Sequence, residues 1–111
     1  MAKRRFDVEL TYGAENDLEQ IHAYLAQHRS IEDANALLDE FLRVIESLES
    51  FPSRGAVPKE LDALGIREFR QLLLRQYRVI YRVGGAKVFV LVIADGRREL
   101  QALLERRLLG Q

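Results

Sequence analysis

The stretch "VFVLVIADGRRELQALL", residues 88–104, decides the fold. Its first seven residues, 88–94, are apolar and rich in β-branched side chains, which are typical of a strand. They do not alternate with polar residues, so we expect this strand to be covered on both faces and to lie centrally in a sheet. The strand leads into Asp95-Gly96-Arg97-Arg98, and the apolar spacing beyond it predicts a short terminal helix whose stripe is Leu100, Leu103, Leu104 and Leu108.

Three further strands are predicted upstream of this stretch. Residues 77–83 and 87–93 are separated by Gly84-Gly85-Ala86, a turn signal that predicts an antiparallel hairpin. Residues 66–74 are rich in large aliphatic side chains and predict a neighbouring strand. Residues 5–10, "RFDVEL", alternate apolar and polar side chains, as a half-buried first strand does.

Two helices are predicted between the first strand and the loop that begins at Phe51-Pro52. Thr11 can cap a helix that ends near Arg29, and Ser30 with Asp33 resembles the capping pair of a second helix. Their two-residue connection predicts a helical hairpin. The sequence thus predicts one α+β domain over residues 1–111, ordered β-α-α-β-β-β-α, with the hairpin packed on one face of a mostly antiparallel four-stranded sheet. The expected core residues are Leu18, Ile21, Leu25, Leu38, Phe41, Ile45, Val79, Tyr81, Phe89 and Leu91.

Composition excludes several classes of protein. The chain has no cysteine, so it has neither a disulfide framework nor a thiolate metal site. No apolar run approaches the roughly 20 residues of a membrane helix, and residues 1–12 lack the apolar core of a signal peptide, so we expect a cytoplasmic protein. His22 and His28 are six residues apart on a predicted helix, so their side chains do not share a face and cannot form a metal pair. No metal or cofactor is expected.

Charge is unevenly distributed along this neutral chain. Residues 1–62 hold 13 acidic and 7 basic side chains, whereas residues 63–111 hold 4 acidic and 10 basic ones. A basic segment can form a local positive surface for phosphates or for an acidic partner peptide. The other interpretation is that the two segments neutralise each other across the fold.

Arginines in the basic segment are the candidate binding residues. The alternation of residues 77–83 places Arg78 and Arg82 on the face opposite the tyrosines and valines, while Arg97 and Arg98 leave the end of the central strand. Guanidinium groups on a rigid strand end are suited to binding phosphate or carboxylate. Alternatively, Arg97 or Arg98 pairs with Asp95 or Glu99 and only caps the sheet. The full candidate set is Arg70, Arg75, Arg78, Arg82, Arg97 and Arg98.

The helical hairpin ending in "FPSRG" (51–55), followed by "GIREF" (65–69), "YRVIYRV" (77–83) and the closing "GRR" stretch, resembles the RelE/ParE superfamily of bacterial type II toxin-antitoxin systems. The likeness spans residues 5–108. It implies a small α+β toxin that a cognate antitoxin neutralises in a hetero-oligomeric complex. RelE-type members cut messenger RNA on the ribosome, and ParE-type members inhibit DNA gyrase.

Individual residues indicate which of these two branches the chain resembles more. Arg78 and Arg98 match arginines of the nuclease branch, and Arg67 or Arg70 lies loosely near the basic second-strand positions of that branch. No tyrosine or histidine follows Arg98, and Leu104 stands where nucleases tend to carry the tyrosine. Arginine stays protonated and is a poor general base, which favours a ParE-like, non-hydrolytic toxin. The alternatives are a ribosome-dependent interferase using Arg78, Arg98 and Arg67, and a non-toxic module that only binds an antitoxin.

Overall fold

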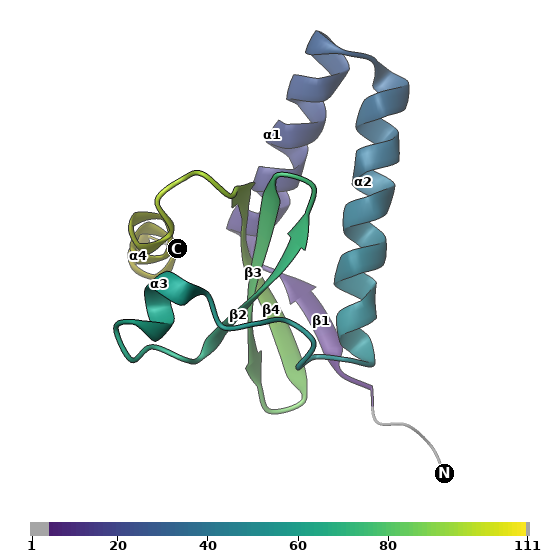
Figure 1. The fold of residues 1–111 in the computed structure, drawn as a ribbon. Coiled ribbons are helices and arrows are strands. Elements are labelled where there is room, and N and C mark those ends of the chain that lie inside the picture. Colours follow the sequence, from purple (N-terminus) through teal and green to yellow (C-terminus); the bar gives the residue numbers. More distant parts are fainter. Residues whose placement is uncertain (1–4, 111) are drawn as a thin grey trace.

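The computed structural model describes residues 5–110, so residues 1–4 and 111 of the expected domain lie outside the described residues. The chain folds into the α+β order predicted from its sequence, with two short helical turns added (Figure 1). The elements are β1 (Asp7–Leu10), α1 (Tyr12–His28), α2 (Ile31–Glu46), the 3-10 helix η1 (Ser47–Glu49), α3 (Lys59–Asp62), β2 (Phe69–Leu74), β3 (Tyr77–Gly84), β4 (Lys87–Asp95) and α4 (Leu100–Gly110).

The four strands form one sheet in the order β1-β4-β3-β2, so β4 lies centrally, as its continuous apolar run predicts. β3 is antiparallel to both β2 and β4, whereas β1 is parallel to β4. The prediction of a mostly antiparallel sheet is confirmed, with β1 as the parallel exception. A parallel neighbour needs a long crossover, and the whole segment from α1 to β3 lies between β1 and β4 in the chain.

The helical hairpin covers one face of the sheet, and both of its predicted caps form. The Thr11 Oγ1 atom accepts a hydrogen bond from the Ala14 amide at 3.2 Å, and the Ser30 Oγ atom accepts one from the Asp33 amide at 3.0 Å. These bonds satisfy amides that a helix leaves unpaired in its first turn. The buried residues under the hairpin are Ala14, Leu18, Leu37, Phe41, Ile45, Leu48, Leu72, Val79, Tyr81, Val88, Val90 and Ile93.

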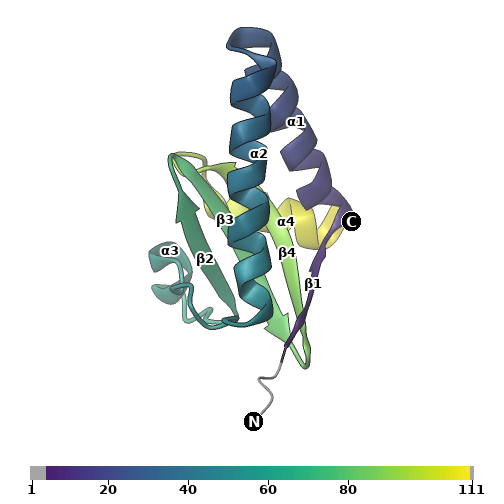
Figure 2. The ribbon, with the colours of Figure 1, turned by 90° about the vertical axis from the view of Figure 1, so that its right-hand side faces the viewer.

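The other face of the sheet is covered by α3 and α4 (Figure 2). A β-bulge in β4 helps to fill this second core: Ile80 lies opposite Val92 and Tyr81 opposite Val90, which leaves Leu91 as the extra residue. Leu91 and Val92 therefore both belong to the core on the α4 side. The two covered faces and the bulge explain why β4 shows no alternation in sequence.

Two sequence expectations are corrected by the structure. The strand predicted over residues 66–74 begins only at Phe69, because the Ile66 amide donates to the Leu61 carbonyl at 2.9 Å and closes the turn after α3. The single helical turn of α3 lies within the predicted loop, since four residues are too few to show helical periodicity. The expected core residues are confirmed as buried, or as half-buried beside one of the two cores. Within residues 5–110 we find no helix with the length and apolar character needed to cross a membrane.

Candidate arginine-bearing binding site

Arg78, Arg97 and Arg98 gather where β4 ends. Arg78 lies opposite Ala94 in the β3–β4 ladder, and the Gly96 amide just beyond donates to the Gln76 carbonyl at 2.7 Å. A β-carbon at Gly96 would lie 3.4 Å from the Arg78 Cγ atom, so the Arg78 stem packs against this turn. The turn carries the two following arginines, and we call Arg78, Arg97 and Arg98 the strand-end cluster.

Arg78 is held by a carboxylate of α3, on the face of the sheet that α3 and α4 cover. Its two terminal nitrogens donate to Glu60 of α3 at 2.8 and 2.9 Å, in the two-point geometry that guanidinium and carboxylate groups favour. Only 14% of the Arg78 side chain is exposed. The hydrogen bonds from Arg78 lower the pKa of Glu60 below its ordinary value. Arg78 therefore ties α3 to the sheet as well as lying in the cluster.

Arg97 and Arg98 differ although they are adjacent. Arg97 is 90% exposed and turns back on Asp95, with both guanidinium contacts at 3.0 Å. These hydrogen bonds hold the pKa of Asp95 below its usual value. The Arg98 amide donates to the Asp95 carbonyl, but its guanidinium makes no hydrogen bond or ion pair with residues 5–110. Of the two arginines, Arg97 is therefore the one that pairs with Asp95. Arg98 keeps a guanidinium that can bind a partner.

The remaining candidate arginines lie elsewhere on the sheet. Arg82 is four residues from Arg78 along β3, a separation of about 13 Å at about 3.3 Å per residue. It lines a groove of about 630 Å³ together with Ser53, Arg67, Glu68, Arg70, Val83 and Gly84. The structure therefore divides the candidate arginines between two ends of the β2–β3 ladder, with Arg75 at the turn between these strands.

Each of these outlying arginines has a contact inside the chain. Arg67 donates to Asp62 at 2.5 Å, and Arg75 pairs with Glu40 of α2. The Arg70 guanidinium donates to the Gly55 carbonyl at 2.6 Å. The Arg82 guanidinium lies 5.8 Å from the centre of the Phe89 ring and 3.9 Å from the Glu68 carboxylate. Arg70 consequently helps to hold the loop at 51–57 against the sheet.

The two strand tyrosines face away from the strand-end cluster. The Tyr81 side chain is fully buried, where its hydroxyl donates to the Pro52 carbonyl at 2.8 Å and accepts from the Gly55 amide at 2.9 Å. Tyr77 turns towards the hairpin and packs edge-on against Phe41, with ring centres 5.4 Å apart. Both tyrosines therefore pack, as their alternation in β3 predicts.

The histidines lie on the hairpin. The His22 Nε2 atom is 2.8 Å from the Asn35 side-chain oxygen, and the His28 ring stacks on Tyr24. Over the described stretch of the chain, no three His, Asp or Glu side chains are placed to share a metal ion.

Sequence reasoning missed Glu60, the carboxylate that binds Arg78 of the strand-end cluster. Glu60 lies in a segment predicted as a loop, so nothing in the sequence connects it with Arg78, 18 residues later. Beside this pair lies a groove of about 480 Å³ along β2, the turn into β3 and the turn at Gly96. It is lined by Lys59, Glu60, Gln71, Leu73, Arg75, Gln76, Tyr77, Arg78 and Gly96.

The fold agrees with comparison to known proteins. A model of the family described as "ParE toxin of type II toxin-antitoxin system, parDE" matches residues 8–100. The chain belongs to this ParE toxin family. Toxin ParE3 of Caulobacter vibrioides is 30% identical to it over 91 residues, which cover 82% of this chain and 87% of that toxin.

Solved structures share the fold of this ParE-family toxin at low sequence identity. The chromosomal ParDE toxin-antitoxin system of P. aeruginosa includes a chain that is 21% identical, with a TM-score of 0.70, over 83% of this chain and 97% of that one. The toxin-antitoxin complex RelBE2 of Mycobacterium tuberculosis includes one that is 16% identical, with a TM-score of 0.59, over 85% and 94%. The family match and the curated relative, together with the shared fold, confirm the resemblance to the RelE/ParE superfamily.

The family match of this ParE-family toxin includes the whole strand-end cluster and stops at the first residue of α4. The helical hairpin, the sheet and the turn at Gly96 therefore belong to the shared architecture. The contacts that α4 makes beyond Leu100 are features of this chain that the family match does not cover.

Proposed function

We propose that this ParE-family toxin inhibits DNA gyrase by binding it, without breaking a phosphodiester bond itself. The observation that carries the proposal is the strand-end cluster, in which Arg98 offers a guanidinium without a proton-transfer group suited to neutral pH beside it. A guanidinium binds carboxylate or phosphate strongly, yet it does not exchange a proton near neutral pH. The cluster is therefore suited to recognition.

The carboxylates nearest the cluster support this distinction. RNA cleavage by a 2′-hydroxyl requires one group to accept a proton and another to deliver one, each with a pKa near the working pH. The pKa values of Glu60 and Asp95 are both lowered by their arginine partners, which is the wrong direction for an acid at neutral pH. Tyr81 is buried and bonded to the loop, and Tyr77 faces the hairpin.

The proposal includes a cognate antitoxin that keeps the toxin inactive in a hetero-oligomeric complex in the cytoplasm. Both solved relatives are described as toxin-antitoxin assemblies. We expect acidic antitoxin side chains to lie against the arginines, because covering a guanidinium without a partner is unfavourable. Alanine at both Arg78 and Arg98 should therefore weaken the complex or abolish toxicity, and the proposed arginine surface is wrong if both properties survive.

The direct test is a supercoiling assay with purified gyrase and purified toxin. We expect the wild-type toxin to inhibit supercoiling and the Arg98→Ala variant to lose most of that inhibition. Arg106→Ala is the matched control, since Arg106 is also an exposed arginine but lies on α4, outside the cluster. Full supercoiling in the presence of wild-type toxin would overturn the proposal.

The interferase alternative is tested on programmed ribosomes. The fold shared with the RelBE2 complex makes it the second candidate. Toeprinting should show no toxin-dependent break in the message. A break at the ribosomal A site that disappears in Arg98→Ala would replace the gyrase assignment. Expression that leaves growth unimpaired, with both assays negative, would identify a non-toxic antitoxin-binding module.

A further inference from the structure

A small pocket lies between the helical hairpin and the turn that joins β2 to β3. It is distinct from the strand-end cluster and has a volume of about 160 Å³. Its lining comes from three elements: Leu25 and Arg29 from the end of α1, Asp33, Ala36 and Leu37 from α2, and Arg75, Gln76 and Tyr77 from the turn. The aliphatic side chains give the pocket an apolar part, and the remaining residues make its polar part.

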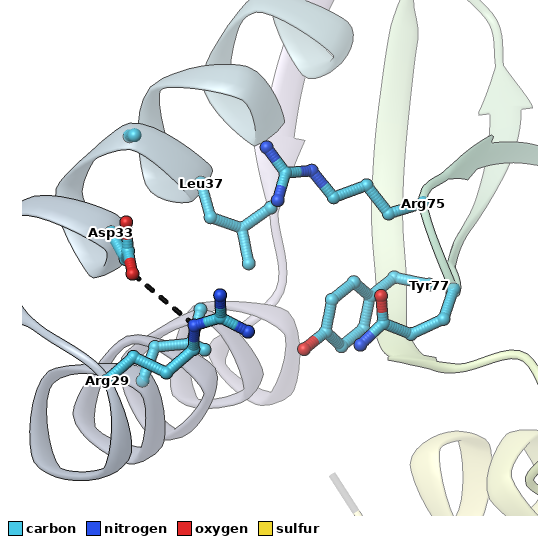
Figure 3. Close-up of a pocket in the computed structure, with 8 residues that line it drawn as sticks. Arg29, Asp33, Leu37, Arg75 and Tyr77 are labelled. Carbon is cyan, nitrogen blue, oxygen red and sulfur yellow. Dashed lines mark hydrogen bonds and ion pairs between the residues drawn. The ribbon is translucent and has the colours of Figure 1, made fainter.

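Hydrogen-bond donors from both sides converge on this pocket. Figure 3 shows the Arg29 guanidinium and the Tyr77 hydroxyl directed towards each other across it, with the Arg75 guanidinium above Leu37. The Tyr77 hydroxyl has no hydrogen-bond partner among residues 5–110. Burial raises the pKa of this hydroxyl, with the charge of Asp95 adding to the effect, so it keeps its proton and remains a donor.

Both arginines are paired inside the chain but keep donors for a ligand. Arg29 contacts Asp33 at 3.3 Å with both side chains more than half exposed, and a pair of this kind contributes only about 0 to 1 kcal/mol to stability. Arg75 pairs with the partly buried Glu40 through its Nε and Nη2 atoms, which leaves its Nη1 atom without a partner among residues 5–110. An incoming carboxylate can therefore take over guanidinium donors at little loss to the fold.

Arg75 reaches the pocket through an unusual backbone conformation. Its φ angle is +54°, and within the described chain it is the one residue other than glycine with positive φ. This left-handed conformation costs a side chain roughly 1–2 kcal/mol, and glycine would adopt it without that penalty. Strained backbone that a protein retains is often found where a side chain binds a ligand. A two-residue hairpin turn between Leu74 and Tyr77 itself requires positive φ at its first position, so the turn accounts for the backbone angle. It is the retention of arginine in place of glycine at this position that points to a use for the side chain.

We propose that this pocket receives the carboxylate of an acidic side chain from the antitoxin, between the guanidinium groups of Arg29 and Arg75 and the hydroxyl of Tyr77. The inference rests on the antitoxin partner of the proposed function and assigns that partner a specific anchoring point. The apolar lining suits the methylene groups of a glutamate, and the two guanidiniums suit its carboxylate oxygens.

Size and charge favour a protein carboxylate over a nucleic acid phosphate. A cavity of about 150 Å³ holds one benzene molecule, so a pocket of this size takes one side chain and excludes a nucleoside. Asp33 at the rim and Glu40 nearby would repel a polyanionic backbone. A single carboxylate replaces one of these partners instead of adding several charges.

The pocket can be tested with small probes on the full-length protein. In a ¹⁵N NMR titration, propionate should shift the side-chain signals of Arg29 and Arg75 with a dissociation constant in the millimolar range, while uncharged propionamide should not. Inorganic phosphate is the competing probe. Equal shifts with phosphate, or none with propionate, would overturn the assignment to a carboxylate.

The binding partner is tested with the cognate antitoxin and two variants at one position. Arg75→Gln removes the guanidinium and keeps the strained backbone, whereas Arg75→Gly removes both. Each should weaken antitoxin binding about tenfold, the equivalent of about 1.4 kcal/mol, and Arg29→Gln combined with either should weaken it further. Arg43→Gln, an exposed position on α2 outside the pocket, should bind as wild type.

Arg75→Gly also separates binding from folding. Because glycine relieves the strain, this variant should keep or raise its melting temperature while it loses affinity for the antitoxin. Wild-type affinity in Arg75→Gly and in the double variants would overturn the inference. If the wild-type toxin binds no antitoxin, the proposed function itself fails, and the gyrase assay remains a separate test.

Discussion

Asp17 on α1 and Arg107 on α4 form a two-point ion pair at 2.7 and 2.9 Å across 90 residues of sequence. The pair also completes an open edge of the sheet. β1 pairs with β4 only as far as Val90, and beyond it the Leu91 carbonyl accepts from Arg107 at 2.6 Å and the Ile93 amide donates to Asp17 at 2.9 Å. Two side chains thus replace the missing strand partner, which keeps backbone polar groups satisfied.

Replacing Arg107 with alanine should destabilise the fold and loosen α4. The change leaves the largely buried Asp17 carboxylate and the Leu91 carbonyl without this donor. We expect the free energy of unfolding to fall by about 2–3 kcal/mol. Urea unfolding measures the loss, and faster exchange of the Ile93 amide would report the exposed edge. Arg106→Ala, one residue away on the exposed side, is the control and should change the free energy of unfolding by less than about 0.5 kcal/mol.

Tyr81→Phe should destabilise the loop at 51–57 without disturbing the shape of the core. The ring remains, but the Pro52 carbonyl and the Gly55 amide lose their shared hydroxyl, which we expect to lower the free energy of unfolding by about 1–2 kcal/mol. Gly55→Ala should be at least as harmful, because its β-carbon would lie 2.6 Å from the Gln71 carbonyl oxygen. Chemical unfolding curves equal to wild type for Tyr81→Phe would show that these hydrogen bonds add no net stability.

The Glu60–Arg78 pair should make stability depend on acid pH. Arg78 lowers the pKa of Glu60 from its ordinary 4.5, so the contribution is fully present above pH 4.5 and disappears as pH falls through the lower native pKa. Glu60 is partly exposed, which limits the contribution to about 0.5–1 kcal/mol. Glu60→Gln should unfold more easily than wild type at neutral pH, and the two proteins should converge as the pH falls through the lowered native pKa of Glu60. A constant difference across this range would contradict the prediction.

Arg98→Ala should separate binding from stability within the strand-end cluster. Its guanidinium has no partner within residues 5–110, so we expect its loss to change the free energy of unfolding by less than about 0.5 kcal/mol. Arg78→Ala, in contrast, should lower the free energy of unfolding, because it removes the contact with Glu60. Parallel measurements of thermal unfolding and gyrase inhibition make the comparison, and a strongly destabilised Arg98→Ala variant would assign Arg98 a structural role.

Local pattern in the sequence was enough for most of the architecture. Apolar periodicity located both long helices, and Thr11 and Ser30 cap them as their positions predict. The continuous apolar run of β4 correctly indicated a central strand covered on both faces. These features are legible because each depends on residues within a few positions of one another, through helical or strand spacing and short capping bonds.

Tertiary structure alone decided which arginines are available. Arg78 and Arg98 look alike in sequence, yet Glu60 from a distant helical turn holds the first, and the second has no side-chain partner within residues 5–110. Arg107, which no sequence pattern singled out, joins the terminal helix to α1 and β4. An ion pair depends on which distant segments come into contact in the folded chain, and local sequence spacing does not predict that contact. The sequence by itself therefore determined the elements and their caps, whereas the packing of α3 and α4 against the sheet determined the partners of the charges.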